Sequence, residues 1–542
     1  MALDTQSDGE ILDVLIVGAG FTGIYMLHSA RDKLGLKAKI VEAGHGVGGT
    51  WYWNRYPGAR CDSPAHIYCF TFDRDLVQEW KWSERFPQQP EILRYLEHCA
   101  DRFETRKDTD FGQFVNSTVY DDAAKLWTVT TDKGNVYKAK FVVAGTGCLT
   151  ARHLPDIDGI DTFKGKSIHT SRWPEGGIDF TGKRVAVVGT GATAVQVIPL
   201  VSLQAKELTV FQRTPAYCVP ARNGQVDPEV VKSRKENYDD IAENVRNSFF
   251  GFDFTFLEGS IFDATPEERK ANFDAIWERG GFEFWLGNYA DMFFSEDANK
   301  MVSDYIRDKI RSVVHDPVTA EKLVPKYAYG TKRNPLETNY YDTFNKDNVH
   351  LVDASTDGPL EEVNETGIRA CGKDYEFDVI IYATGFDAMT GALKNMNVVG
   401  KNGLALNDLW ADGPESYLGL TVSGFPNFFT VTGPQSPSAF SNVPVSIEQH
   451  VEFITEAIHH LHETGKSQIE PTPQAQKDWV QHVNDMINAS IIPKTDSWYT
   501  GSNIPGKARK FLVYLDPAGV GGYRKRLEQV VENNYEGFEL SA

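Results

Sequence analysis

Two glycine-rich turns, each placed between an apolar run and a helical pattern, limit most strongly what this chain can fold into. Residues 11–17 (ILDVLIV) are rich in Val, Ile and Leu, which is typical of a buried parallel strand. The turn GAGFTG (18–23) follows, then a helical pattern to about residue 35 and a second apolar run, AKIVEA. The same order recurs from residue 182, with KRVAVVG, the turn GTGATA (189–194), a helix over 193–200 and ELTVFQR. These two β-α-β units predict an α/β fold with two dinucleotide-binding, Rossmann-like domains.

The rest of the chain divides around these two units. A length of 542 residues suits two or three domains. Residues 224–326 are charged, helical in pattern and poor in β-branched runs, so we expect a helical insertion there. Strand signals return at NVHLVDAS and FDVIIYATGFD. We expect the first nucleotide-binding domain to comprise residues 1–148 and 387–542, and the second to comprise residues 149–223 and 327–386.

Composition excludes several classes of partner. The net charge of −20 opposes binding to nucleic acid and to anionic membranes. Six cysteines occur without a CxxC pair, which favours a reducing cytoplasm and argues against a dithiol redox site. The polar start MALDTQSDGE does not resemble a secretory signal, and no apolar run approaches the length of a membrane span. We expect a cytoplasmic protein without a metal site; its oligomeric state is not predicted.

The ends of the two returning strands predict different nucleotides. Glycines in such turns let a pyrophosphate approach the backbone, and Glu42 is placed to accept hydrogen bonds from a ribose diol. At the matching point of the second unit stands Arg213, whose guanidinium would attract a 2′-phosphate, so we expect NADPH there. The alternative for Arg213 is a solvated surface residue. The expected contacts to the first nucleotide are Gly18, Gly20, Phe21, Gly23 and Glu42. Those to the second are Gly189, Thr190, Gly191, Ala192, Thr193, Gln196, Arg213 and Thr214.

A second glycine pair points to a flavin. In flavoproteins with two dinucleotide units, a glycine pair after the first unit lies along FAD, and here Gly49, Thr50 and Trp51 stand at that place. A plain turn is the alternative. The segment ATGFD (383–387) also recurs in such proteins at connections between domains. Two nucleotide sites therefore predict hydride transfer from NADPH to bound FAD, with the first domain holding FAD.

One string is far more specific. Residues 163–174 read FxGxxxHxxxWP, formed by Phe163, Gly165, His169, Trp173 and Pro174. This string resembles the fingerprint of the type I Baeyer–Villiger monooxygenases and precedes the second glycine turn, as in that family. The segments GGTWYWNRYPGARCDS, FQRTP, GTKR, ATGFD, SIEQHVE and SWYTGSNIPGK are similar to family segments in order and spacing. By these the chain most resembles the phenylacetone monooxygenase branch, although Val443-Pro444 departs from it.

The resemblance implies an activity and site residues. It implies that FAD, NADPH and O2 convert aryl-alkyl, linear or cyclic ketones to esters or lactones through a C4a-peroxyflavin, and that sulfides are also oxidised. Arg333 matches the arginine that stabilises negative charge, and Asp62 matches the aspartate that pairs with it beside the cofactor. An ordinary surface ion pair is the alternative for Arg333.

Further roles are assigned through the same resemblance. Lys332 and Thr214 would join Arg213 at the 2′-phosphate. Trp498 would lie in a mobile loop over NADP and substrate, or would be a core aromatic. His169 would affect interdomain geometry and the use of NADPH, without acid–base chemistry. The bulge with Ser438, Ala439 and Phe440 would line the substrate pocket.

Three other functions compete with this one. A flavin-containing or N-hydroxylating monooxygenase would attack sulfur or nitrogen, but such enzymes typically lack the Trp-Pro ending. A non-catalytic NADPH-binding redox sensor would not consume NADPH with substrate. An NADPH oxidase would release peroxide whatever ketone is present.

Overall fold

The structure is a computed structural model that describes residues 10–542. The expectation for the polar N-terminal segment concerns residues 1–9, which lie outside the described residues. Within residues 10–542, no helix is both long enough and apolar enough to cross a bilayer.

The first glycine turn lies on an eight-stranded mixed sheet in the order β17-β4-β5-β6-β1-β2-β3, with β18 also paired to β6. The parallel centre is β1 (Leu12–Val17) between β2 (Ala38–Val41) and β6 (Val136–Ala144). The remaining strands are β3 (Thr109–Asp110), β4 (Val115–Asp121), β5 (Leu126–Thr131), β17 (Val398–Val399) and β18 (Phe428–Thr430). Since β17 and β18 come from the C-terminal part, that part returns to the first sheet.

The second glycine turn lies on a separate sheet of five parallel strands, in the order β12-β9-β8-β16-β7. Its strands are β7 (Lys166–His169), β8 (Arg184–Val188), β9 (Glu207–Gln212), β12 (Val349–Asp353) and β16 (Val379–Tyr382). The central strands are apolar and buried on both faces, as parallel strands between helices must be. The predicted α/β fold with two Rossmann-like sheets is confirmed.

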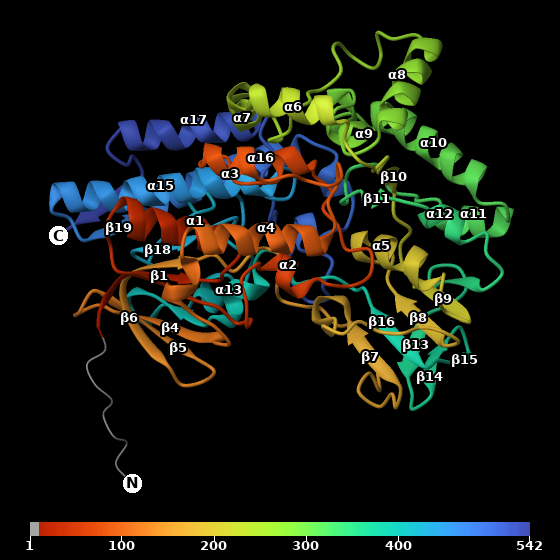
Figure 1. Ribbon diagram of the computed structural model, residues 1–542, viewed down its shortest axis with the longest axis horizontal. Helices are drawn as coiled ribbons and strands as arrows, with labels where there is room; N and C mark the ends of the chain where they lie inside the picture. The colour runs from red at the N-terminus through yellow and green to blue at the C-terminus, as the bar shows by residue number, and fades with distance from the viewer. Residues whose placement is uncertain (1–9) are drawn as a thin grey trace.

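Helices cover the first sheet. Helix α1 (Phe21–Leu27) continues as a π-helix (His28–Lys33) and packs against α15 (Val443–Thr464). Figure 1 shows α15, α16 (Pro473–Asn488) and α17 (Gly519–Glu532) together above this sheet. The same part of the molecule also contains α2 (Thr50–Trp53), α3 (Arg74–Glu79), α4 (Gln89–Arg102), α13 (Gly391–Asn395) and α14 (Leu406–Leu409).

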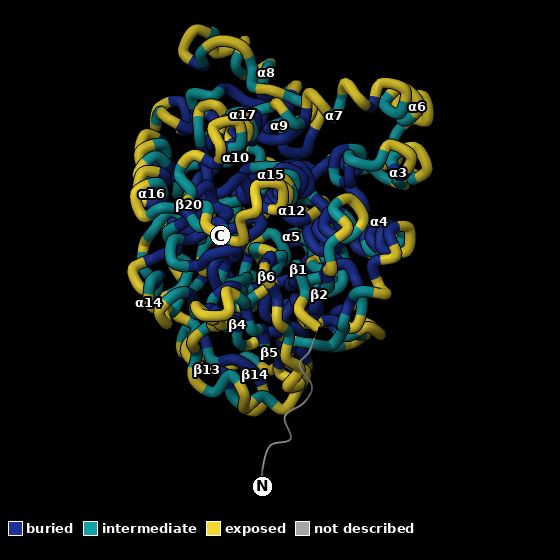
Figure 2. The backbone as a smooth tube through the Cα atoms, turned by 90° about the vertical axis from the view of Figure 1, so that its left-hand side faces the viewer, coloured by how far each residue is buried: buried dark blue, intermediate teal, exposed yellow. Residues whose placement is uncertain are grey.

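The charged middle of the chain is helical, as the sequence indicates. It holds α6 (Pro228–Glu236), α7 (Tyr238–Asn247), α8 (Pro266–Arg279), α9 (Glu283–Leu286), α10 (Glu296–Val313) and α11 (Pro317–Leu323). Helix α8 begins with a capping box between Thr265 and Glu268, which satisfies two end N–H groups. Figure 2 shows exposed chain along α6 and α8 and buried chain at the centre of the molecule.

Smaller elements complete the chain. Helix α5 (Ala192–Val201) follows β8, and α12 (Tyr340–Thr343) precedes β12. Three small sheets are formed by β10 (Val219–Pro220) with β11 (Leu336–Glu337), by β13 (Leu360–Val363), β14 (Gly367–Ala370) and β15 (Lys373–Glu376), and by β19 (Gln468–Pro471) with β20 (Phe538–Ser541). The expected residue boundaries between domains stay predictions.

Candidate active site

The first glycine turn is packed so tightly that side chains are excluded. Gly18 has a φ of 105°, and its N–H donates to the carbonyl of Val41 at 2.9 Å. A Cβ atom on Gly23 would lie 2.0 Å from the carbonyl oxygen of Gly18. Helix α1 therefore starts directly against the end of β1, with Gly20 as an N-cap that has no side-chain partner.

The second glycine pair touches this turn. The N–H of Gly48 donates to the carbonyl of Ala19 at 2.9 Å, and a Cβ on Gly49 would lie 3.0 Å from the Cα of Gly20. Helix α2 follows, with Trp51 buried and its Nε1 donating to the Tyr68 hydroxyl at 3.1 Å. Two bare backbone segments thus meet, and such a cradle fits the pyrophosphate of FAD.

Glu42 has a structural task that sequence analysis missed. Its carboxylate accepts the N–H of Ala19 at 2.7 Å and that of Gly44 at 2.6 Å. Burial raises the pKa of this carboxyl, although the two N–H groups act to lower it. Each carboxylate oxygen has a second acceptor position, so Glu42 can hold the glycine turn and still accept from a ribose.

The second glycine turn has the same conformation as the first, but the space in front of it is open. Gly189 has a φ of 112°, and a Cβ there would lie 2.5 Å from the carbonyl oxygen of Ala383. A Cβ on Gly191 would meet nothing within 4 Å, so the space before α5 is free. Thr190 Oγ1 donates to the carbonyl of Thr214 at 2.7 Å, which holds residues 213–214 beside the turn.

Two cations lie near that turn without a matching anion. Arg213 is exposed and forms no ion pair with any residue in the described range 10–542. Lys332 Nζ donates only to the carbonyl of Asp496, at 2.5 Å. Burial and the charge of Arg213 both lower the pKa of Lys332, which places the two cations close together. The 2′-phosphate of NADPH would supply the missing negative charge.

Arg333 and Asp62 form the charged centre of the site. Arg333 Nη2 donates to Asp62 Oδ2 at 2.5 Å, and Nη1 donates to the carbonyl of Ala439 at 3.2 Å. The guanidinium lies 5.2 Å from the ring centre of Phe282. Burial acts to lower the pKa of Arg333, but Asp62 and Tyr499 outweigh it and raise this pKa. Arg333 is therefore a fixed cation whose direction two acceptors determine.

Aromatic side chains wall this centre. The ring of Phe440 lies 4.8 Å from Tyr499 and 5.7 Å from Trp285. Tyr499 is fully buried, and its hydroxyl has no hydrogen-bond partner among residues 10–542. Ser438 Oγ donates to the carbonyl of Ser436 at 3.3 Å, so it supports the bulge from behind. A ketone held here would be shielded from water and face Arg333.

His169 ties β7 to the ATGFD segment. Its Nδ1 accepts the N–H of Ser171 at 3.2 Å, so Nε2 carries the proton and donates to the carbonyl of Gly385 at 3.2 Å. Burial lowers the pKa of His169 to about 4, so the ring is neutral near pH 7. A neutral histidine with both ring nitrogens hydrogen-bonded positions two segments and has no free nitrogen for proton transfer.

The remaining fingerprint residues pack locally. A Cβ on Gly165 would lie 2.4 Å from the ring of Phe163 and 2.7 Å from the carbonyl oxygen of Asp378. Trp173 is buried, with its ring 6.1 Å from that of Phe180. Pro174 then turns the chain, its carbonyl accepting the N–H of Gly177 at 3.0 Å.

Contacts also run from this region to the first domain. The guanidinium of Arg172 lies 4.2 Å from the ring centre of Trp53, and Arg55 pairs with Glu175 at 2.8 Å. Gln196 on α5 accepts from the Tyr56 hydroxyl at 3.1 Å and donates to the carbonyl of Arg60 at 3.2 Å. The structure thus uses Gln196 to join the two nucleotide-binding parts.

Comparison with known proteins places this geometry in a family. Residues 12–238 match the family described as Flavin-binding monooxygenase-like. A protein of Pseudooceanicola batsensis named Baeyer-Villiger monooxygenase is 41% identical over 98% of this chain and 97% of its own length. The chain belongs to the Baeyer–Villiger monooxygenase family. Acetone monooxygenase (methyl acetate-forming) of Gordonia sp. is 42% identical over 98% of this chain and 99% of its own length.

Solved structures agree over the whole length. Cyclohexanone monooxygenase from Rhodococcus sp. Phi1 bound to NADP+ gives a TM-score of 0.96 at 42% identity, covering 99% of this chain and all of that one. The OTEMO complex with FAD and NADP gives 0.94 at 43% identity, covering 98% and 99%. The family and fold expected from the sequence are confirmed, and the OTEMO complex holds the expected cofactor pair, FAD and NADP. The phenylacetone branch stays a prediction.

One relative bears on the competing function. Phenazine N-monooxygenase of Lysobacter antibioticus is 40% identical over 99% of this chain and 97% of its own length. Full-length similarity to Baeyer–Villiger monooxygenases therefore does not by itself separate oxidation of carbon from oxidation of nitrogen.

Part of the wall of this candidate site comes from residues that no sequence motif indicated. Phe282 and Trp285 come from the helical insertion at α9, where no motif stands out. Tyr499 follows Trp498, which is half-buried with its ring 4.6 Å from that of Tyr499. Only the segment SWYTGSNIPGK carried a signal for this region, and it drew attention to the tryptophan alone.

Proposed function

We propose that this protein is an NADPH-dependent Baeyer–Villiger monooxygenase that uses FAD and O2 to convert ketones to esters or lactones. The observation that carries the proposal is the half-buried pair of Arg333 and Asp62, held at 2.5 Å beside an aromatic wall. FAD reduced by NADPH would supply the activation of O2, and O2 is the source of the inserted oxygen atom.

The chain contributes charge, position and exclusion of water. Arg333 would stabilise the negative charge that develops on the ketone oxygen during attack, in a site where water is scarce. Asp62 and the carbonyl of Ala439 hold the guanidinium before the substrate arrives, so little reorganisation is needed. Phe440, Trp285 and Phe282 would form the apolar surface for the body of the ketone.

The proposed substrates are aryl-alkyl, linear and cyclic ketones, with sulfides as additional substrates. Support comes from the mainly aromatic wall, which offers few polar groups to select one ketone. The names of the relatives, acetone monooxygenase and cyclohexanone monooxygenase, point to both linear and cyclic compounds.

The test is a ketone panel with the purified FAD-loaded protein, NADPH and air, with products identified by mass spectrometry. We expect ketone-dependent NADPH consumption and one ester or lactone per NADPH. Peroxide release that no ketone alters would indicate an oxidase instead. A colourless protein that cannot take up FAD would refute the proposal.

Oxidation of nitrogen is the second candidate, favoured by the similarity to the phenazine N-monooxygenase. The Arg333–Asp62 pair supports ketone oxidation instead, because a fixed cation favours the negative charge that attack on a carbonyl requires beside it. Competition between phenylacetone and phenazine at equal concentration separates the two, since ester should exceed N-oxide. An excess of N-oxide over ester would make oxidation of nitrogen the favoured function.

We also infer the division of labour along the chain. Residues 1–148 and 387–542 would bind FAD, residues 149–223 and 327–386 would bind NADPH, and residues 224–326 would contribute the α9 wall. The acidic net charge and the unpaired cysteines support a cytoplasmic location.

A further inference from the structure

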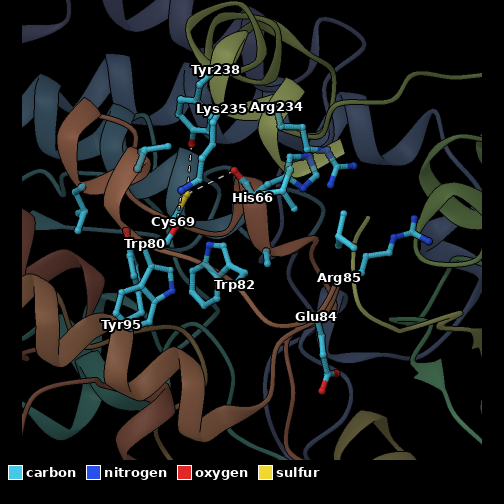
Figure 3. Close-up of a pocket in the computed structure, with 15 residues that line it drawn as sticks. His66, Cys69, Trp80, Trp82, Glu84, Arg85, Tyr95, Arg234, Lys235 and Tyr238 are labelled. Carbon is cyan, nitrogen blue, oxygen red and sulfur yellow. Dashed lines mark hydrogen bonds between the residues drawn. The ribbon is translucent and has the colours of Figure 1, made fainter. Parts of the chain in front are cut away.

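A cavity opens between α3 and α6, at the contact between the first domain and the helical insertion (Figure 3). Its volume is about 630 Å³ when its open mouth is included. Arg333, Asp62 and Phe440 are not among the residues that line it. The cavity is therefore distinct from the proposed site of ketone oxidation.

The interior of this cavity is aromatic. Trp80 lies 5.8 Å from Trp82 and 5.3 Å from Tyr95, and Trp82 lies 5.0 Å from Tyr95, each measured between ring centres. Figure 3 shows these three rings grouped on one side of the cavity. Val77 and Val231 add aliphatic surface from α3 and α6. An apolar body of a ligand would be desolvated against this wall.

The mouth of the cavity is positively charged, in a chain whose net charge is −20. Arg85, Arg234 and Lys235 line it, and Glu84 is the single carboxylate among the lining residues. Glu84 is already paired with Arg60 at 3.2 Å. The excess charge at the mouth is therefore cationic.

Arg234 is the cation without a direct anionic partner in the part of the chain that the structure describes, although its charge, with His66, lowers the pKa of Asp253 against the effect of burial. Lys235 Nζ donates to the carbonyls of Gln78 and Trp80, at 2.6 and 2.9 Å, and Arg85 contacts Glu283 at 3.5 Å. Within residues 10–542, Arg234 forms no hydrogen bond and no ion pair through its side chain. His66 also lines the cavity, and its ring is hydrogen-bonded to Asp253 at 2.7 Å.

We propose that this cavity binds an amphipathic carboxylate, with an aliphatic or aromatic body against Trp80, Trp82 and Tyr95 and its carboxylate on Arg234. Charge and shape together select this class. A neutral ketone would leave the guanidinium unpaired, and a small inorganic anion would leave the aromatic wall in contact with water. The site lies beyond the proposed reaction, which requires no carboxylate.

The cavity also lies next to segments that carry the active site. Arg85 donates to the carbonyl of Arg279 at 2.5 Å, three residues before Phe282. The N–H of Ala65, three residues after Asp62, donates to the carbonyl of Arg85 at 2.8 Å. A carboxylate bound at Arg234 would thus lie in a cavity that is also lined by Arg85, and Arg85 contacts both segments.

Binding of sodium decanoate to the FAD-loaded full-length protein, measured by isothermal titration calorimetry, tests the proposal without any turnover. We expect saturable binding with one site, and much weaker binding of 1-decanol, which has the same chain without the charge. Arg234→Gln should weaken decanoate binding about tenfold, as expected for the loss of one charge-assisted hydrogen bond. Lys232→Gln is the matched control, since it removes an exposed cation of the same helix outside the cavity, and it should bind as the parent does.

A second variant covers the case in which the first one misfolds. Val231→Trp should fill the cavity and abolish binding, while thermal unfolding reports whether each variant is folded. The proposal is overturned by the absence of saturable decanoate binding to the parent protein. It is equally overturned when Arg234→Gln and Val231→Trp both bind decanoate as the parent does, or when 1-decanol binds as tightly.

Discussion

At the scale of single residues, the chemistry depends on how Arg333 is held. Its guanidinium has two protein acceptors, Asp62 and the carbonyl of Ala439, and the remaining N–H groups are left for a substrate or cofactor. An exposed ion pair of the same length would contribute at most about 1 kcal/mol to stability. The half-buried pair is better explained as an electrostatic device for the reaction than as a source of stability.

Replacement of that cation gives the first prediction. Arg333→Ala should lower the rate of ester formation about 100- to 1000-fold, because a preorganised charge is lost from the reacting centre. Reduction of bound FAD by NADPH, followed by absorbance without oxygen, should persist. The control is Arg311→Ala, which removes an exposed arginine paired with Glu321 and should leave both steps unchanged. Ester formation at the parent rate in Arg333→Ala would refute the assignment.

The unpaired cations near the second turn give the second prediction. Arg213→Ala and Lys332→Ala should each raise the KM for NADPH about tenfold or more, because each removes a charge-assisted contact to the 2′-phosphate. The KM for NADH, which lacks that phosphate, should change little. Lys206→Ala, at an exposed position of the same sheet region, serves as the control. An unchanged preference for NADPH over NADH in both variants would exclude this phosphate site.

At the scale of elements, bare backbone and one histidine hold the parts together. The turn after β1 and the pair Gly48-Gly49 approach so closely that glycine is required at several positions. His169 connects the end of β7 to the segment after β16, through the carbonyl of Gly385. Such contacts fix the angle between an element that would hold NADPH and one that leads back to the FAD-binding part.

Acid sensitivity of the His169 contact gives the third prediction. The pKa of His169 is about 4 in the folded protein, against an ordinary value of 6.5. The unfolded chain therefore binds a proton at a higher pH than the folded protein does. The stability that the neutral ring contributes is complete above pH 6.5 and is lost as the pH falls through 4. The loss is on the order of 3 kcal/mol. The advantage of the parent over His169→Gln in free energy of unfolding should therefore shrink between pH 7 and pH 4, as measured by urea unfolding.

The matched control for that experiment is His459→Gln, which removes an exposed histidine of α15. This control reports the effect of losing an imidazole at the surface. A difference between His169→Gln and the parent that does not change between pH 7 and pH 4 would refute the prediction for His169.

At the scale of the whole molecule, a mixed sheet, a parallel sheet and the helical insertion meet around one charged centre. Asp62 comes from the first domain, Arg333 from the chain after the insertion, Phe282 from the insertion and Phe440 from the C-terminal part. No single segment contains the site. Binding of FAD should therefore stabilise the assembly as a unit.

Removal of the flavin gives the fourth prediction. Stripping FAD should lower the melting temperature, and adding FAD at 100 times its Kd should restore about 2.7 kcal/mol. FMN should not restore it, because FMN lacks the adenosine diphosphate half that the turn 18–23 and Glu42 would hold. Differential scanning calorimetry with each flavin provides the measurement. Equal rescue by FMN would show that the first glycine turn does not bind the dinucleotide.

The types of the main elements and the fold class follow from short stretches of the amino-acid sequence. Apolar runs of five to seven residues ended by glycine turns have few stable solutions other than buried parallel strands leading into helices. Residues 163–174 likewise indicated the family, and the segment GTKR indicated Arg333. Such motifs can be recognised in the sequence because glycine turns and charged residues act through local chemistry. The helical insertion was visible in the same way, from charge and periodicity.

Which side chains meet, in contrast, depends on how the folded segments pack. Contacts between segments far apart in the chain set several properties of the candidate site. They account for the bond from Glu42 to the glycine turn, the neutral state of His169 and the wall formed by Phe282, Trp285 and Tyr499. The same holds for the cationic mouth beside Trp80, where α3 and α6 come together. Burial and distance set these properties, and neither is encoded in the neighbours of a residue along the sequence.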